Sequence, residues 1–529
     1  MFRVFTDKLP GTVEPACFIT ILSECYRAFA FPRREICRTS DEARQVTRRG
    51  NKALEIGVID ISDKFRKDPR LVQFAKTLPG PSFNSDLFLA DSSRIQKILQ
   101  TYSEKYGSTY RFWLGKYLLI GISNIEDLQV VLHQTETLSK PKFFQYFVDY
   151  FGIGLFSAPL HLWKKNRKRL QPFFAKNVLK YHIKTINESI SKYVKLIENH
   201  ANGPEFDIYQ YLPSLAFESF IRVYFGLTLN EKYVKYFNFH EILNAGGHYG
   251  ILRIFVFWLR CDFIANFYFK KILNVAKKKN KEFFEIMKKN EFDPVKKEPI
   301  LKHREMSLFS VSRSLEEEWK LENLIKDEMF TFTAAASETT AVTNSFLFLI
   351  LAMYPNIQKK LYDEIIEVLG QSSSSIDISD IERLSYLDQV IKEVQRRFTL
   401  VPFIFRSNES TDIKLASMTI PAGANIMIRI NDLHLNPDFY PDPYKFNPDN
   451  FHPKAVSKRS KYSFIPFSTG SRDCIGKIYA NTVIKLTVII FLRNFTFHTT
   501  TKLEDIELET GFVSKKKGGY FLSIRLRKD

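Results

Sequence analysis

Cysteine is scarce in this sequence, and its few copies show no pairing pattern. The 529 residues contain five cysteines: Cys17, Cys25, Cys37, Cys261 and Cys474. Neither the odd number nor the spacing fits a disulfide framework or a zinc ribbon. The scarcity therefore excludes a disulfide-stabilised secreted scaffold, and we expect the folded part of the chain to reside in a reducing compartment.

Long apolar runs are also missing. No stretch of about 18 residues is both apolar and free of charge, so hydropathy predicts no transmembrane helix. Near the N-terminus, the apolar run Cys17–Leu22 is short and flanked by acidic residues, which does not fit a signal peptide. Membrane association has to be argued from other features.

Acidic residues are outnumbered by basic ones, 58 to 77, which gives a formal net charge of +19 at pH 7. Such a chain is attracted to nucleic acids, membrane surfaces and acidic proteins. No zinc-finger, helix-turn-helix or RNA-binding signature accompanies the charge, so we expect no nucleic-acid partner. Lysines cluster in Phe269–Glu291, where Ile272, Val275, Phe283 and Ile286 predict an apolar stripe. A solvated helix face is the expected explanation of that cluster.

The chain divides at a proline- and glycine-containing loop. Residues 1–77 are charged and show no sustained periodicity, so we interpret them as an N-terminal extension of unknown role. Two prolines and a glycine in Leu78–Pro81 mark a loop. Residues 78–529 are long enough for one large enzyme-sized domain.

The hydrophobic patterns predict a mixed fold in which helices dominate. Thr109–Ser123 has the composition of two strands around a turn, whereas residues 155–397 are mainly helical. The long apolar segment Met329–Met353 predicts a helix through the centre of the protein. Short strands are expected in Ile420–Ile430 and in a final hairpin with its turn at Lys516–Gly519. The predicted fold class is α+β, mainly α-helical, with a minor β-sheet.

The segment FSTGSRDCIG, Phe467–Gly476, surrounds the last cysteine with residues that suit an iron-bound thiolate. A thiolate binds haem iron and donates electron density that favours cleavage of the oxygen–oxygen bond. Gly470 and Gly476 permit tight turns that direct backbone N–H groups at the sulfur. The ring of Phe467 would shield the sulfur, and Arg472 would pair with a haem propionate. A helix that begins after the loop would bring its positive end to the thiolate.

This loop resembles the haem loop of the cytochromes P450 at Phe467, Gly470, Arg472, Cys474 and Gly476. The resemblance extends through ordered motifs over residues 78–529 and is strongest to the fourth clan of that superfamily, especially its insect members. It implies the cytochrome P450 fold, with haem b buried between the long central helix and the helix of the cysteine loop. Cys474 would be the axial ligand of the iron, and the haem would otherwise be held without covalent bonds.

Other motifs of the family follow in order. Glu393 and Arg396 match its Glu-x-x-Arg pair, which ties a helix to the meander before the haem loop. Arg406 matches a strand residue that binds a propionate. Trp163 and Arg167, in the segment WKKNR, match two further propionate donors. Taken singly, each has a simpler explanation, such as a salt-bridged helix, a packed ring or a surface charge.

The chain departs from the family pattern at several positions. In the meander Asp432–Phe451, Leu435 replaces the commoner arginine. Asn450 stands where many members have the arginine that completes a triad with Glu393 and Arg396, so we expect a weaker triad. Ala335 occupies a position where many fourth-clan members have a glutamate that can form an ester with the haem. A covalent haem link is therefore not expected.

Glu338 and Thr339 in the long central helix match the family's acid–alcohol pair and are the predicted catalytic residues. The chemistry requires protons at the oxygen-binding face of the haem, so Thr339 would hold a water and Glu338 would relay protons. The alternative is an ordinary buried threonine and glutamate, although a buried carboxylate is costly without partners.

The resemblance implies a monooxygenase that inserts one atom of O2 into an apolar small molecule such as a fatty acid, a hormone or a xenobiotic. The chain has no dinucleotide or flavin motif, so its electrons would come from an NADPH-cytochrome reductase. Lys458, Arg459, Lys461 and Lys477 can meet an acidic reductase surface, or can be scattered solubilising charges.

Three points stay open at this level. The aromatic segment Lys140–Phe156 suits long apolar substrates, but its rings equally suit an ordinary core. Residence at the cytoplasmic face of the endoplasmic reticulum membrane follows from the resemblance alone. Two other functions compete with monooxygenation: a haem-thiolate isomerase or dehydratase that acts on peroxides, and a non-catalytic haem-binding relative.

Overall fold

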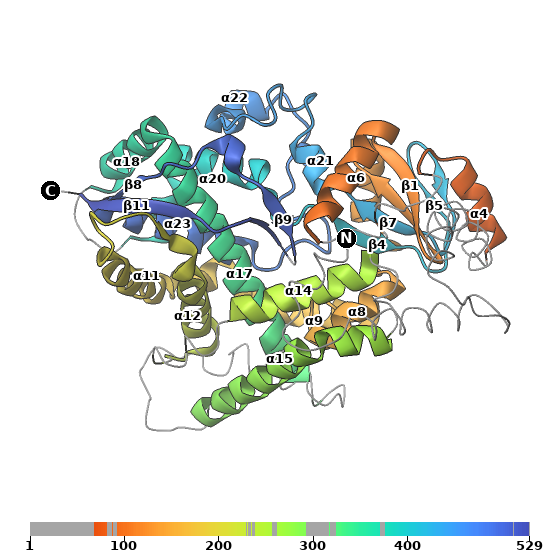
Figure 1. Ribbon diagram of the computed structural model, residues 1–529, viewed down its shortest axis with the longest axis horizontal. Helices are drawn as coiled ribbons and strands as arrows, with labels where there is room; N and C mark the ends of the chain where they lie inside the picture. The colour runs from red at the N-terminus through yellow and green to blue at the C-terminus, as the bar shows by residue number, and fades with distance from the viewer. Residues whose placement is uncertain are drawn as a thin grey trace, which may run out of the picture. The chain divides into compact units, whose positions relative to one another are not determined.

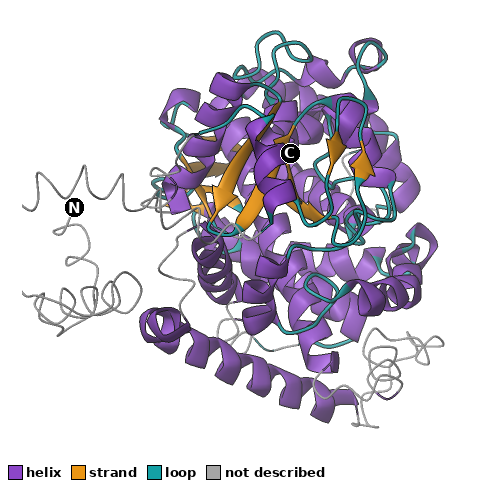
Figure 2. Ribbon diagram, turned by 90° about the vertical axis from the view of Figure 1, so that its right-hand side faces the viewer, coloured by secondary structure: helices purple, strands orange, loops and turns teal. Residues whose placement is uncertain are grey.

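Helices dominate the part of the chain that the structure describes, and small sheets accompany them (Figures 1 and 2). The structure, a computed structural model, describes residues 68–81, 87, 92–228, 230, 234, 239–255, 262–291, 317, 324–370, 376–511 and 513–527. The predicted α+β, mainly helical fold class is confirmed. The N-terminal extension predicted at residues 1–77 lies outside the described residues except for residues 68–77. These contain α4, Pro69–Lys76, in which Leu71 and Ala75 are buried.

The central helix is α17, Leu324–Met353, which contains the predicted segment Met329–Met353 (Figure 1). It packs against α12, Leu212–Phe225, α14, Phe239–Phe255, and α23, Lys477–Asn494. Among the described helices, α17 alone is long and apolar enough to cross a membrane, but 83% of its most apolar window is buried in the protein. It is therefore a core helix, as its apolar composition predicts.

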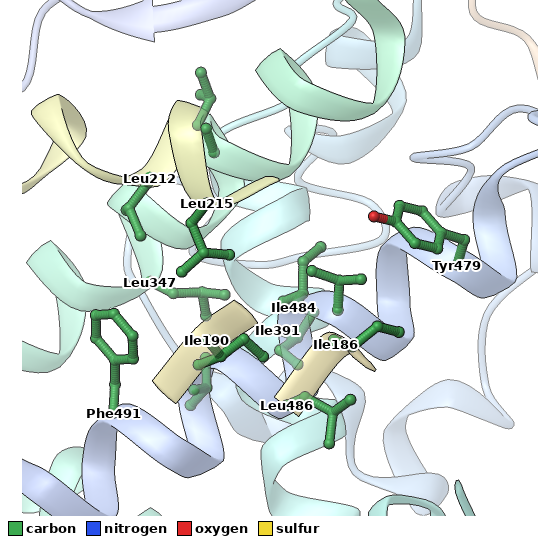
Figure 3. Close-up of a cluster of buried hydrophobic side chains, with 14 of the residues drawn as sticks. Ile186, Ile190, Leu212, Leu215, Leu347, Ile391, Tyr479, Ile484, Leu486 and Phe491 are labelled. Carbon is green, nitrogen blue, oxygen red and sulfur yellow. The ribbon is translucent and has the colours of Figure 1, made fainter. Parts of the chain in front are cut away.

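Figure 3 shows the apolar core that joins α17 to the C-terminal helix α23. Branched aliphatic side chains from five helices pack there, and the rings of Phe348 on α17 and Phe491 on α23 stack with centroids 4.8 Å apart. Complete burial of each such side chain stabilises the fold by about 1.5–3 kcal/mol. The labelled contributors are Ile186 and Ile190 of α11 (Ile183–Glu198), Leu212 and Leu215 of α12, Leu347 of α17, Ile391 of α20 (Ser385–Arg397), and Tyr479, Ile484, Leu486 and Phe491 of α23.

The largest sheet has the strand order β1-β2-β7-β4. The predicted two strands in Thr109–Ser123 are β1, Thr109–Leu114, and β2, Tyr117–Ile122, which pair antiparallel. Strand β7, Asn425–Ile428, runs parallel to β2, and β4, Ile404–Ser407, runs antiparallel to β7. This arrangement places Arg406 in an edge strand whose backbone is fixed by the sheet.

The predicted final hairpin is wrong. Strand β10, Ser514–Lys516, pairs with β9, Leu508–Thr510, whereas β11, Phe521–Leu526, pairs with β3, Phe206–Asp207, and β8, Phe495–His498. Gly518 and Gly519 do adopt positive φ angles of 83° and 92°, which turn the chain sharply. The turn, however, carries the chain from one sheet into another and does not join paired strands.

The lysine-rich segment forms part of α15, Asp262–Glu291. Lys277 and Lys278 are exposed, as expected for a solvated face, and Phe283 is buried. Val275 does not belong to the buried stripe, because 44% of its surface is exposed. The buried neighbours are Leu273, two positions before Val275, and Ala276, one position after it.

The remaining elements connect these parts. In chain order they are α6 Ser92–Tyr106, α7 Ile125–His133, η1 Lys142–Phe144, α8 Gln145–Phe151, α9 Leu160–Leu170, η2 Gln171–Phe174, α10 Lys176–Lys180, η3 Ile208–Gln210, α18 Pro355–Leu369, α19 Ile378–Glu382, β5 Ile413–Lys414, β6 Thr419–Ile420, α21 Ile430–His434, η7 Pro448–Phe451, α22 Pro453–Val456, η8 Lys461–Ser463 and η9 Leu503–Asp505.

Candidate active site

The loop that carries Cys474 is closed by its own backbone. The Cys474 amide donates to the Phe467 carbonyl at 2.9 Å, and the Asp473 amide donates to the Gly470 carbonyl at 3.0 Å. Gly470 has a φ of 79°, and a Cβ atom there would lie 2.1 Å from the carbonyl oxygen of Leu132 in α7. Only glycine fits this close approach, so the loop is held in one shape against the end of α7.

The thiol of Cys474 lies in an environment of opposing influences. Burial is the largest and raises its pKa, as does the charge of Asp473, whereas the backbone amide of Gly476 and the positive charges of Arg167 and Lys477 lower it. The side chain is nevertheless solvent-accessible. Gly476 is the N-cap residue of α23, which places the positive helix end beside the sulfur. A bound metal cation would supply the charge that keeps such a sulfur deprotonated.

Three cationic side chains gather near the cysteine loop, and we call Lys140, Arg406 and Arg472 the cation cluster. The guanidinium of Arg472 lies 3.9 Å from the centre of the Trp163 ring, and its Nε donates to the Leu138 carbonyl at 3.0 Å. Its Nη2 is buried and has no hydrogen-bond partner among the described residues. Sequence reasoning predicted Arg406, Arg472 and Trp163 for this region but missed Lys140.

Burial and repulsion among its own members lower the pKa values of the cation cluster. Burial lowers the pKa of Arg406 to about 10, and burial followed by repulsion from Arg406 and Arg167 lowers the pKa of Arg472 to about 9. Burial, then Arg406 and Arg472, lowers the pKa of Lys140 well below its usual value. Among the residues that the structure describes, no carboxylate contributes to any of these shifts. Buried cations are stable only when paired, so the donor set fits a dianionic group such as the two haem propionates.

Arg167, the other predicted propionate donor, is engaged elsewhere. Its Nη2 forms an ion pair with Asp473 at 2.7 Å, and its Nη1 donates to the Asp473 carbonyl at 2.7 Å. These two contacts attach α9 to the residue directly before Cys474. Arg167 therefore fixes the position of the cysteine loop through Asp473.

Glu393 and Arg396 form a fully buried ion pair on α20. Two hydrogen bonds of 2.7 Å join the side chains. Arg396 also donates to the carbonyls of His434, Pro443 and Lys445. The pair thus fixes the meander against α20.

Asn450 completes this arrangement with a hydrogen bond in place of a second ion pair. Its Nδ2 donates to Glu393 Oε1 at 3.1 Å, and the backbone amide of Asn447 donates to the same oxygen at 2.9 Å. Arg459, which sequence reasoning assigned only to a surface, donates to the Asn450 carbonyl and stacks on the Tyr440 ring at 4.3 Å. The cationic side chain of Arg459 therefore contacts the backbone of Asn450.

The two side chains of the predicted acid–alcohol pair of α17 have different partners. The Thr339 hydroxyl donates to the Ala335 carbonyl at 2.7 Å, and Ala335 is exposed although it lies within a core helix. Glu338 is fully buried and interacts with Tyr209 and Lys515. Burial raises the pKa of Glu338, and these two partners oppose that rise. No hydrogen bond joins the Glu338 and Thr339 side chains in the described part of the chain.

Phenylalanine rings that pack together in one apolar cluster adjoin Lys140, and we call this set the aromatic cluster. The rings of Phe143 and Phe405 lie 5.2 Å apart, and Phe405 precedes Arg406 in β4. The ammonium of Lys140 lies 4.5 Å from the Phe144 ring centre. The members are Phe143, Phe144, Phe147, Phe151, Phe156, Phe255, Phe330, Phe403 and Phe405.

Comparisons with known proteins show the family to which the chain is similar. The family model described as Cytochrome P450 matches residues 76–523. Cytochrome P450 4g1 of Drosophila melanogaster is 26% identical over 468 residues, which cover 81% of this chain and 84% of the relative. Cytochrome P450 4c21 of Blattella germanica is 28% identical over 428 residues, 78% of this chain and 84% of the relative. Cytochrome P450 4V2 of Homo sapiens is 26% identical over 453 residues, 82% of this chain and 85% of the relative.

Proposed function

Because the chain belongs to the cytochrome P450 family and is a haem-thiolate monooxygenase, we propose that Cys474 is the ligand of its haem iron and that the cation cluster binds the haem propionates. The observation that carries this proposal is the position of three cations beside the closed cysteine loop, none of which pairs with a carboxylate of the described residues. When bound, the haem activates dioxygen so that one oxygen atom enters the substrate.

Each remaining site residue has a role in holding that arrangement. Trp163 orients the guanidinium of Arg472 by stacking beneath it. Arg167 orients the cysteine loop through Asp473, which is a positioning role. The Phe467 carbonyl accepts from the Cys474 amide, and its ring would shield the sulfur. Gly476 donates its amide toward the thiolate. Glu393, Arg396 and Asn450 are structural residues that fix the meander leading into the loop.

Thr339 and Glu338 are the proposed catalytic residues. The hydroxyl of Thr339 already donates within its helix, so its oxygen lone pairs are free to accept from a water. Glu338 would supply the protons that this water passes on. Thr339→Ala should therefore divert reducing equivalents to hydrogen peroxide while haem binding persists. Unchanged coupling would remove Thr339 from the relay.

The substrate proposed for this site is an apolar small molecule: a fatty acid, a hormone or a xenobiotic. The aromatic cluster supports this class, because its rings adjoin Lys140 and Arg406 at the proposed haem edge. Titration of the purified haem protein with fatty acids, steroids and planar xenobiotics, followed by haem difference spectra, tests the proposal. Perturbation by polar compounds alone would contradict it.

The proposed electron donor is an NADPH-cytochrome reductase at the cytoplasmic face of the endoplasmic reticulum membrane. Lys458, Lys461 and Lys477 are exposed and suit an acidic partner, whereas Arg459 is only partly exposed and bonds to Asn450. Rising salt should slow reduction by the reductase, because it screens this attraction. A rate independent of salt would dispose of the docking surface.

One assay separates this function from its competitors. NADPH oxidation, O2 consumption and product formation are measured with a reductase and an apolar substrate present. A monooxygenase oxidises NADPH, consumes O2 and forms product in parallel. Conversion of an organic hydroperoxide without NADPH or O2 would favour an isomerase or dehydratase, and haem binding without any turnover would favour a non-catalytic relative.

A further inference from the structure

Glu338 belongs to a buried three-residue network that no sequence motif indicates. The Tyr209 hydroxyl lies 2.9 Å from each carboxylate oxygen of Glu338 and donates to this carboxylate. The ammonium of Lys515 forms an ion pair with Glu338 Oε1 and donates to the Tyr209 hydroxyl oxygen at 2.9 Å. Each polar group thus contacts the other two, and we call these residues the Glu338 network.

The Glu338 network is assembled by elements that are far apart in the sequence. Glu338 lies on α17, Tyr209 on η3 and Lys515 on β10. Asp207 accepts from the backbone amides of both Tyr209 and Tyr520, which fixes η3 against the C-terminal strands. The Ser514 amide donates to the Leu400 carbonyl at 2.7 Å and fixes the residue before Lys515. The three side chains are therefore held by anchored backbone.

The network also has a direction. The Glu338 side chain is 0% exposed, whereas 9% of the Lys515 side chain reaches solvent. Tyr209 is also partly exposed, but Lys515 is the cationic member that reaches solvent, so a proton can enter through its ammonium group. Glu338 is the member next to Thr339 in the helix. Replacing a buried ion pair by apolar residues often leaves the stability of a protein unchanged or improved. A contribution to folding stability therefore does not explain the ion pair of Lys515 and Glu338.

We propose that Lys515 and Tyr209 are positioning residues that hold Glu338 ionised and recharge it with protons from the β9–β10 side of the protein. This inference rests on the proposed role of Glu338 and deepens it. In the transfer, an N–H bond of Lys515 breaks and an O–H bond of Glu338 forms, which leaves two neutral groups. The carboxyl group then turns toward Thr339 and gives the proton to the water that Thr339 would hold, which restores the Glu338 carboxylate. Lys515 regains one proton from solvent, so one proton passes and no electron moves.

The test compares single and double variants of the haem-loaded protein. Lys515→Met removes the charge at similar length, Lys515→Arg keeps the charge, and Tyr209→Phe keeps the ring but removes both hydrogen bonds. The matched control is Lys517→Met on the same segment, because Lys517 pairs with Glu507 in solvent, where the two side chains are 61% and 74% exposed. Haem content and the unfolding midpoint of each variant show whether it folds.

Three quantities are measured: the fraction of NADPH electrons lost to hydrogen peroxide, the solvent deuterium isotope effect on turnover, and the infrared band of a protonated carboxyl group. With Lys515→Met the peroxide fraction should rise about 10-fold, less than the 10²-fold or greater effect typical of losing a general acid itself. The isotope effect should increase, and a carboxyl band should appear that is absent in Lys515→Met/Glu338→Gln. Tyr209→Phe should show a smaller rise, and Lys515→Arg should restore the ionised carboxylate. Lys517→Met should match the wild type.

The inference is overturned if folded Lys515→Met and Tyr209→Phe proteins match Lys517→Met in all three quantities. Glu338→Gln separates this failure from failure of the relay itself. If Glu338→Gln uncouples turnover but the Lys515 and Tyr209 variants do not, only the further inference fails. If Glu338→Gln leaves coupling unchanged, the proposed role of Glu338 fails, and the inference falls with it.

Discussion

The guanidinium of Arg472 is held between two fixed partners, the Trp163 ring at 3.9 Å and the Leu138 carbonyl at 3.0 Å, while its Nη2 stays unpaired among the described residues. The Arg472 guanidinium is thus oriented without a bound anion, because it is stacked on a ring and only part of its hydrogen-bonding capacity is used. Preorganisation of this kind lowers the entropic cost of binding an anion. The fold therefore holds the proposed haem-binding guanidinium in place without the cofactor.

Trp163→Leu should weaken haem retention. The leucine keeps the site apolar but removes the cation–π contact, which is worth about 1 kcal/mol when partly buried. We expect faster transfer of haem to an apo-globin acceptor, and Trp163→Phe should lie between the two proteins. Equal transfer rates for all three would show that stacking does not orient Arg472.

Lys140→Met should also weaken haem retention, although sequence motifs give no reason to expect it. Loss of a charge-assisted contact to a propionate costs about 1.5–3 kcal/mol, which corresponds to about 10-fold or more in haem affinity. Lys142→Met is the matched control, because Lys142 is exposed two positions away. If both variants release haem at the wild-type rate, Lys140 does not contact the cofactor.

Glu393→Gln should destabilise the protein far more than Asn450→Ala. The first leaves the fully buried Arg396 without its counter-ion, which costs about 3–5 kcal/mol. The second removes one hydrogen bond at 3.1 Å, which is worth about 1 kcal/mol. Denaturant unfolding of both variants measures the difference. Equal losses would mean that Asn450 carries as much of the network as the ion pair.

The buried side chain of His434 should make the folding stability of the protein depend on pH. Burial, followed by the charge of Arg396, lowers the pKa of His434 from 6.5 to about 3. The folded protein therefore keeps His434 neutral where the unfolded chain protonates it. Stability is fully present above pH 6.5 and is lost as the pH falls toward the folded-state value.

The slope of the unfolding free energy against pH can be measured. The free energy of unfolding should fall by up to about 1.4 kcal/mol per pH unit below pH 6.5 on account of His434. His434→Gln can still accept from the Ile465 amide, as the histidine Nε2 does at 3.0 Å, but it does not titrate. Its unfolding free energy should depend less steeply on pH between 6.5 and 5. Parallel pH profiles would assign the acid sensitivity to other groups.

How much of the site was predictable depends on whether its residues are neighbours in the sequence. The cysteine loop could be predicted because Phe467, Gly470, Arg472, Cys474 and Gly476 act together within one short segment. Glu393 and Arg396 are one helical turn apart, and their pairing follows from helix geometry. Local motifs thus carried most of the candidate site.

The residues that sequence reasoning missed are defined by tertiary contacts. Lys140 stands in a phenylalanine-rich stretch, and nothing local shows that Arg406 and Arg472 face it. Tyr209 and Lys515 are 306 positions apart in the sequence. The wrong C-terminal hairpin has the same cause, because Gly518 and Gly519 specify a turn but not the strand that pairs after it.

The carbon-monoxide difference spectrum of the reduced haem protein, recorded for the wild type and for Cys474→Ser, tests the central claim most directly. Cys474 is the one cysteine among the described residues, and its loop supplies the amide of Gly476 to the sulfur. The account predicts that the wild type shows the long-wavelength Soret band of thiolate ligation. The variant should lose this band while its unfolding midpoint stays close to that of the wild type. Retention of the thiolate band by Cys474→Ser, or its absence from the haem-loaded wild type, would contradict the assignment of Cys474 as the iron ligand.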